Sequence, residues 1–408
     1  MAFPKMFRVR QKFDCWAIER PEEVLREQLR AKGIMNRISP GKRVCITAGS
    51  RAIANLVTLM ATLVDEFKKR GTHPFIVPAM GSHGGATADG QLAVLRRLGI
   101  REETVNAPII SSMKVVEVGR TAEGLPVYCD EEACHADFIV IVNRVKAHTA
   151  FKASIESGLM KMMAVGLGKR EGAEVAHAHG LAEAIPQLAR VLLEKTPIGL
   201  GVALVENQLG QTAKIAVLEP DEIEEAEKQL LKEAKHLMLR LPFDQIDVLI
   251  VEEIGKNISG TGMDTNVIGI GRRIGGKWKP EVGKIVVLDL TEESQGNALG
   301  IGLADLTTRR LVNKIDWRAT YANVIATGYM GTGKIPVTLE SDREAIRVAL
   351  QGYAPDQVRL VRIRNTRDLQ EIDVSEGLLE EVQSRDDLII VEELGELGFD
   401  SQGNLLRL

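Results

Sequence analysis

The chain has 408 residues, of which 45% are hydrophobic and 26% are charged, and its formal net charge is −4. This length predicts two or three domains, and this composition is typical of globular proteins, which excludes disordered and fibrous classes. The small net charge and the 4% of aromatic residues give no reason to expect nucleic acid or an acidic membrane surface as a partner.

Two features bear on the compartment. No stretch approaches the roughly 18 consecutive apolar residues of a membrane span, and the first residues carry charges where a signal peptide would be apolar. The four cysteines are irregularly spaced, so we expect no disulfide framework and a reducing, cytoplasmic environment. Cys129, Cys134 and His135 form a C-x4-CH pattern, but no second pair of ligands follows, and a structural zinc site is not expected.

Short β-branched runs alternate with amphipathic helical patterns along the first half of the chain. The predicted strands are 43–48, 73–80, 137–145 and 198–207, and the predicted helices are 53–71, 88–100 and 181–195. Such alternation predicts an α/β fold with a mostly parallel sheet covered by helices on both faces.

A highly charged helical pattern over 219–241 interrupts this rhythm, and we interpret it as a connector between domains. Strand and helix patterns then resume. We therefore predict two α/β domains, 1–240 and 241–390, with a tail, 391–408, that packs back on the first domain. Ligand sites are common between domains, so we expect the active-site cleft there.

Three histidines fall in loops that follow predicted strands. His83 lies in the glycine-rich AMGSHGGAT segment, His148 lies in VNRVKAHTA, and His177 follows in EVAHAHG. Open α/β sheets bind their ligands at the carboxyl ends of their strands. A single histidine is more often a hydrogen-bonded loop residue, but two at equivalent strand ends favour a functional site.

Several cations lie near the same loops. Lys161 is surrounded by leucine and methionine, so it either extends its charge to solvent or is desolvated and reactive. Lys169 and Arg170 suit a phosphate near a helix start or a solvated surface. Arg51 follows the first strand of the alternating pattern, where a guanidinium can take a carboxylate, and Ser50 before it is a natural N-cap.

Taken together, these segments resemble the nickel-pincer lactate racemase family of 2-hydroxyacid racemases and epimerases. TAGSR resembles the motif that ends in a substrate-binding arginine, GSHGG and RVKAHTAF resemble the loops of two catalytic histidines, and SGLMK resembles the motif of the cofactor-binding lysine. The departures are Ala48 in place of an aspartate, and Leu159 and Met160 in place of glycine and arginine.

The resemblance implies a role for each of these residues. His83 and His148 would be the acid/base pair, Lys161 would be covalently joined to a nickel pyridinium-3,5-bisthiocarboxylate mononucleotide, and His177, 16 residues beyond Lys161, would bind the nickel. Ser50 and Arg51 would contact the substrate, as would Arg272 in the second domain. The reaction would be reversible hydride transfer to the cofactor, and the enzymes that synthesise this cofactor would be partners.

Two other hypotheses remain open at this point. His83, His148 and His177 could hold a divalent metal for hydrolysis or dehydration, or the chain could be a non-catalytic module that binds sugar acids or nucleotides. The sequence does not name the 2-hydroxyacid, although Arg272 and Arg273 favour malate or a sugar acid over lactate. It also does not indicate the oligomeric state.

Overall fold

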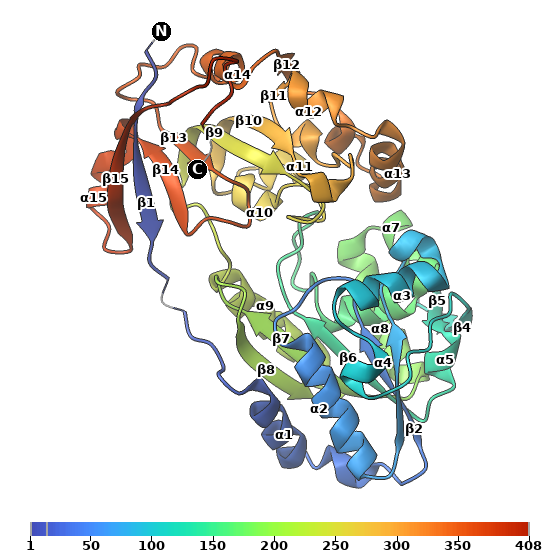
Figure 1. Cartoon of the computed structure of the whole chain (residues 1–408). Coiled ribbons are helices and arrows are strands. Elements are labelled where there is room, and N and C mark those ends of the chain that lie inside the picture. The colour runs from blue at the N-terminus through green and yellow to red at the C-terminus, as the bar shows by residue number, and fades with distance from the viewer. Residues whose placement is uncertain (1, 14, 407–408) are drawn as a thin grey trace. The chain divides into compact units, whose positions relative to one another are not determined.

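The computed structural model describes residues 2–13 and 15–406 and divides the chain into two compact units. The first unit is Cys15–Met238, and the second combines Met1–Asp14 with Leu239–Leu408. Both are α/β units, as predicted (Figure 1). Among the described residues, no helix combines the length and the apolar composition needed to cross a bilayer.

The first unit is built on a five-stranded sheet in the order β3-β2-β6-β7-β8. Its first four strands are parallel, and β8 runs antiparallel to β7. A two-stranded antiparallel sheet, β4-β5, packs beside it. The strands are β2 (Arg43–Ala48), β3 (His73–Pro78), β4 (Val115–Arg120), β5 (Pro126–Asp130), β6 (Phe138–Arg144), β7 (Ile198–Glu206) and β8 (Thr212–Leu218).

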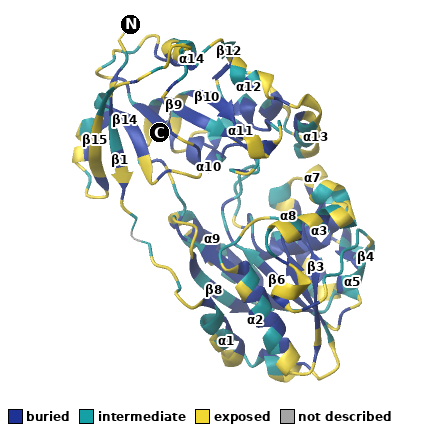
Figure 2. Cartoon of the chain, in the orientation of Figure 1, coloured by how far each residue is buried: buried dark blue, intermediate teal, exposed yellow. Residues whose placement is uncertain are grey.

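Helices cover both faces of this sheet because successive residues of its buried strands point to opposite sides. One face packs against α1, α2 and α3, and the other packs against α6, α8 and α9. The helices of this unit are α1 (Pro21–Ala31), α2 (Leu56–Lys69), α3 (Ala88–Arg97), α4 (Glu102–Val105), α5 (Glu131–Cys134), α6 (Leu159–Lys161), α7 (Lys169–Ala178), α8 (Leu181–Lys195) and α9 (Ile223–His236). Figure 2 shows the strands as buried and the outer helix faces as exposed.

Helix α9 differs from the connector expected over 219–241. Ile223, Leu230, Leu231 and Ala234 are buried in the core that covers one face of the sheet. Their spacing places them on one side of the helix, while the charged residues occupy the remainder. The segment is therefore an amphipathic helix of the first unit and not a connector, despite its high charge.

The second unit contains an eight-stranded sheet in the order β12-β11-β10-β9-β13-β14-β1-β15. The first five strands are parallel, and the last three are paired antiparallel. The strands are β1 (Lys5–Gln11), β9 (Gln245–Ile254), β10 (Glu281–Leu290), β11 (Leu306–Thr308), β12 (Val337–Leu339), β13 (Leu360–Ile363), β14 (Glu371–Ser375) and β15 (Leu388–Glu396).

Short helices surround this second sheet. The α-helices are α10 (Thr265–Ile268), α11 (Gly271–Ile274), α12 (Arg309–Asn313), α13 (Trp317–Thr327), α14 (Asp342–Ala349) and α15 (Leu379–Gln383). Short 3-10 helices of the two units lie at Ile34–Arg37, Gly84–Ala86, Glu292–Ser294, Ile301–Leu303, Met330–Gly333 and Glu376–Leu378.

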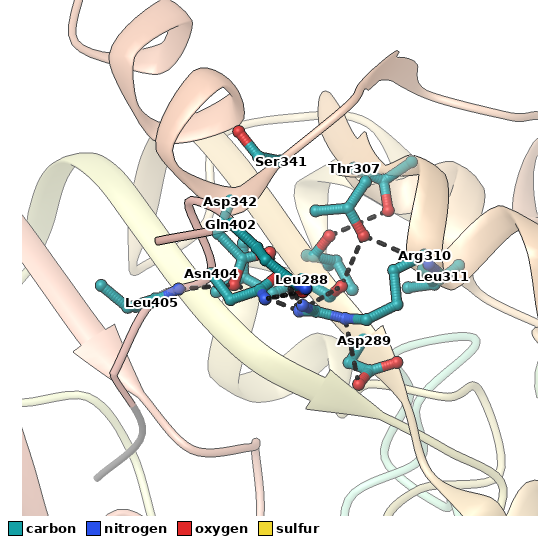
Figure 3. Close-up of polar contacts among 12 residues, drawn as sticks. Leu288, Asp289, Thr307, Arg310, Leu311, Ser341, Asp342, Gln402, Asn404 and Leu405 are labelled. Atoms are coloured by element: carbon teal, nitrogen blue, oxygen red, sulfur yellow. Dashed lines mark hydrogen bonds and ion pairs between the residues drawn. The ribbon is translucent and has the colours of Figure 1, made fainter. Parts of the chain in front are cut away.

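The two ends of the chain differ from the expected domain boundaries. Strand β1 belongs to the second unit, where it lies between β14 and β15. The C-terminal residues also pack on the second unit. Figure 3 shows Arg310 bound to Asp342 and Asn404, while the Leu405 N–H donates to Asp342 at 2.8 Å. The tail stays with the second unit because β1 supplies the backbone hydrogen-bond partners of β15, the strand with which the tail begins.

Candidate functional site

Loops from three adjacent parallel strands carry the predicted site residues of the first unit. Arg51 follows β2, His83 follows β3 and His148 follows β6. Because β2 lies between β3 and β6 in the sheet, these loops leave the same edge side by side. The strand order thus brings together segments that lie up to 97 positions apart in the sequence.

Lys161 is the last residue of α6, and a π-helix, Met162–Leu167, continues directly from it. This π-helix packs on the ends of β2 and β3. The Gly81 N–H donates to the Gly166 carbonyl at 3.3 Å, and a methyl group added at Gly166 would lie 2.8 Å from the Ala79 carbonyl oxygen. π-Helices occur frequently at functional sites, and this one fixes Lys161 against the strand ends.

The Lys161 side chain contacts His148 directly, with Nζ 2.8 Å from Nε2. The Ala150 N–H donates to Nδ1 of His148 at 3.0 Å, so Nδ1 accepts and the imidazole proton lies on Nε2. That proton points at Lys161, which accepts it only as a neutral amine. Desolvation, followed by the charges of Arg51 and Lys146, lowers the pKa of Lys161 to about 8, which makes the neutral amine more accessible than in an ordinary lysine.

The loop that carries His148 is held by the buried carboxylate of Glu156. This carboxylate accepts hydrogen bonds from the N–H groups of His148 at 2.6 Å and Ala153 at 3.2 Å, and it forms an ion pair with Lys235 of α9 at 2.6 Å. Its side chain is fully buried. Glu156 therefore positions His148 through its backbone.

A second buried carboxylate, Glu227 of α9, holds the start of the Lys161 helix. It accepts the Met160 N–H at 2.9 Å, and it occupies the space beside Gly158 where any other side chain would collide with it. Burial raises the pKa of Glu227 to about 7. The N–H groups in the first turn of a helix lack acceptors within the helix. Glu227 supplies the acceptor for one of these groups, the Met160 N–H.

His83 is exposed, and its Nδ1 lies 2.8 Å from the Met80 carbonyl oxygen. A carbonyl only accepts, so Nδ1 carries a proton, and in the neutral imidazole the lone pair then lies on Nε2. The backbone of this loop is bound by Gln91, whose amide donates to Gly81 O at 2.7 Å and His83 O at 3.3 Å.

Lys169 supports this arrangement from inside the protein. It is fully buried, binds the Gln91 side-chain oxygen at 3.3 Å, and pairs with the buried Asp130 at 2.9 Å. It is therefore neither solvated nor directed at a phosphate. Arg170 is exposed and pairs with Glu174 on the same helix.

Arg51 is exposed and makes no hydrogen bond or ion pair with the described part of the chain. The surrounding protein and the charge of Arg144 lower its pKa, and Arg144 is itself paired with Glu206. Arg51 thus offers a free guanidinium suited to an oxyanion. Ser50 lies beside it in a bend and does not cap α2, because that helix begins six residues later, at Leu56.

Most of the first unit matches a known protein family. Residues 15–187 match the family described as the lactate racemase N-terminal domain.

This segment belongs to the lactate racemase N-terminal domain family.

No curated protein matches the chain. The lactate racemase apoprotein from Thermoanaerobacterium thermosaccharolyticum is structurally similar, with a TM-score of 0.55 and 12% sequence identity, over 89% of this chain and 99% of that one. A structural-genomics protein from Thermotoga maritima has a TM-score of 0.50 and 13% identity, over 85% of this chain and 97% of that one. At these identities the likeness establishes the fold.

Two further predicted site residues, His177 and Arg272, lie on helices α7 and α11. His177 is exposed in the last turn of α7 of the lactate racemase N-terminal domain. Within residues 2–13 and 15–406, no group of three or more histidine, cysteine or acidic side chains could hold a metal. Arg272 lies in the second unit, where Asp305 at 2.8 Å and the carbonyls of Leu303 and Val282 occupy its guanidinium.

Sequence reasoning missed three residues that support the site in the first unit, namely Gln91, Glu156 and Glu227. Glu227 had a detectable signal: it follows Ile223 by four residues and precedes Leu230 by three, so it lies on the apolar side of its helix. Glu156 and Gln91 had none, because a single polar residue in a loop or helix does not reveal its burial.

Proposed function

We propose that this protein is a racemase or epimerase of a 2-hydroxyacid, with a nickel-pincer nucleotide cofactor covalently joined to Lys161. The contact between Lys161 and His148 carries the proposal. It holds a desolvated amine with a pKa of about 8 against an imidazole at 2.8 Å, in a domain of the lactate racemase family. A partly neutral amine at neutral pH is nucleophilic, as covalent attachment requires.

The residues present fit this cofactor. Lys161 supplies the amine for the tether, and His177 supplies an imidazole, which is an appropriate ligand for nickel. When bound, the cofactor would accept a hydride from the carbon that carries the hydroxyl group and return it to either face.

The chain's own residues would bind the substrate and move its proton. Arg51, free of internal partners, would bind the carboxylate, with Ser50 beside it. His83 would take the hydroxyl proton at Nε2, the nitrogen that keeps its lone pair. Inversion needs an acid/base group on each face of the substrate, and His148, which Glu156 positions, would be the second, returning a proton to the oxygen from Nε2.

The departures from the family pattern concern the substrate more than the chemistry. Leu159 and Met160 are fully buried beside Lys161, where they pack rather than contact a ligand. Arg272, which the resemblance assigned to the substrate, is occupied by Asp305. We retain malate or a sugar acid as the proposed substrate class, and the cytoplasm, where the cofactor-synthesising enzymes would act, as the compartment.

The test is expression together with enzymes that make the cofactor, followed by metal analysis, intact mass spectrometry and a chiral assay against a panel of 2-hydroxyacids. We expect nickel, a covalent mass increment on Lys161 and interconversion of enantiomers. Lys161→Ala should lose the increment and the activity, whereas Lys195→Ala, at an exposed lysine, should keep both.

Other results would identify other functions. Metal without a covalent increment would favour the hydrolase or dehydratase hypothesis, and neither metal nor increment would favour a binding module. A folded Lys161→Ala protein with full racemase activity would overturn the proposal.

A further inference from the structure

Arg273, in the short helix α11 of the second unit, is a buried arginine without a counter-ion. Only 9% of the residue is exposed. Within the described part of the chain, its guanidinium makes no ion pair and no hydrogen bond, and its Nη1 atom is fully buried without a partner. The neighbouring Arg272 is the opposite case, because Asp305 neutralises it at 2.8 Å.

One aromatic ring faces this guanidinium. The Arg273 Cζ atom lies 5.0 Å from the ring centroid of Tyr329, whose hydroxyl donates to the Arg272 carbonyl at 3.4 Å. Burial lowers the pKa of Arg273, so the protein environment disfavours the charge. A cation–π contact compensates for only part of the cost of burying a charge, and buried charges in native proteins are normally paired.

The guanidinium is also reachable from solvent. Its Nε and Nη2 atoms have no protein partner either, yet only Nη1 is fully enclosed. These two atoms form the edge on which a carboxylate or phosphate binds with two parallel hydrogen bonds. Ile274, the next residue in the chain, and Trp278 are 40% and 42% exposed, so α11 and the segment that follows it lie at the surface of the second unit.

We propose that Arg273 is the anchor of an oxyanion site in the second unit, which binds the carboxylate or phosphate group of a small-molecule ligand. The ligand's charge would replace the missing counter-ion, and the ring of Tyr329 would keep the guanidinium plane fixed. This inference goes beyond the proposed racemase activity and does not depend on Lys161. An organic carboxylate and a phosphate are the two sources of such a group.

The experiment measures the melting temperature of the full-length apoprotein at constant ionic strength with sodium chloride, phosphate, lactate or malate. Arg273→Met keeps an unbranched side chain against Tyr329 and removes the charge. Without added anion we expect this variant to melt at a higher temperature than the wild type, because an unpaired buried charge is gone. Phosphate or a carboxylate should raise the melting temperature of the wild type only.

Calorimetric titration with the most effective anion should show binding at least about tenfold weaker in the variant. A response to phosphate alone assigns the site to a phosphorylated ligand, and a response to lactate or malate assigns it to an organic acid. Either supports the proposal.

Arg310→Met is the matched control, because Arg310 is paired with Asp289 and Asp342. It should lower the melting temperature and leave the anion response intact. The proposal is overturned if no anion stabilises the wild type, if Arg273→Met keeps the response or melts at a lower temperature, or if Arg310→Met abolishes the response as well.

Discussion

Glu227 makes the stability of the first unit depend on pH near neutrality. Its pKa is about 7 in the folded chain, against an ordinary value of 4.5, because the carboxyl group is buried. A carboxyl whose pKa is raised by folding favours the folded state while it is protonated. Its contribution is complete below pH 4.5 and is lost as the pH rises through 7. The difference in pKa corresponds to about 3 kcal/mol in total, of which about 2.5 kcal/mol disappears between pH 5 and pH 8.

Glu227→Gln isolates this contribution, because the amide oxygen can still accept the Met160 N–H but does not titrate. We would measure urea unfolding from pH 5 to pH 8 with Trp278 and Trp317 replaced by phenylalanine. Trp16, the one tryptophan left among the three of the chain, then reports on the first unit. The wild type should lose about 2.5 kcal/mol relative to the variant over this range.

Glu224→Gln is the control on the same helix. Arg190 lowers the pKa of Glu224 to about 2, so the stability it contributes is present above pH 4.5 and is lost only as the pH falls towards 2. The difference between this variant and the wild type should therefore be constant from pH 5 to pH 8. An equally constant difference for Glu227→Gln would refute the reasoning about Glu227.

Three further predictions concern the same unit. Acylation of Lys161 by a water-soluble ester, followed by mass spectrometry, should rise with a midpoint near pH 8, and a midpoint near 10.5 would contradict the desolvated amine. Asp130→Asn should reduce the free energy of unfolding by about 3 to 5 kcal/mol because Lys169 stays buried without its partner, whereas the exposed Glu194→Gln should change it by less than about 1 kcal/mol. Equal effects in denaturant unfolding would argue against the buried pair. Gly166→Ala should cost about 1 to 3 kcal/mol, since the added methyl would lie 2.8 Å from a backbone carbonyl at the end of β3. An unchanged melting temperature would mean that the π-helix can move away.

The fold class could be predicted because the strands of the first unit are short, β-branched and separated by amphipathic helices. The same periodicity placed Arg51, His83 and His148 at strand ends, which the structure confirms. The meeting of their loops could not be read from periodicity, because it depends on β2 lying between β3 and β6.

The finer features of the site depend on burial and contact, which the sequence does not encode locally. The sequence allowed two interpretations of Lys161, a lysine that extends to solvent or a desolvated one. The contact with His148 favours the second. Lys169 was assigned to a phosphate or to solvent, whereas Asp130, almost 40 residues earlier in the sequence, pairs with it in the interior. Arg272 was predicted to contact the substrate, whereas Asp305 pairs with its guanidinium.

The pairing of β1 with β14 and β15 has a consequence for biosynthesis. Residues 5–11 leave the ribosome long before their partners, residues 371–375 and 388–396, are translated. The segment that carries Lys161 is therefore an insertion within the other unit, and it can fold while that unit is still incomplete. Domains generally fold as units during synthesis, so a nascent chain would contain a folded first unit while β1 is still unpaired. Chains that stop before residue 371 would leave that strand permanently unpaired, and such edges promote aggregation.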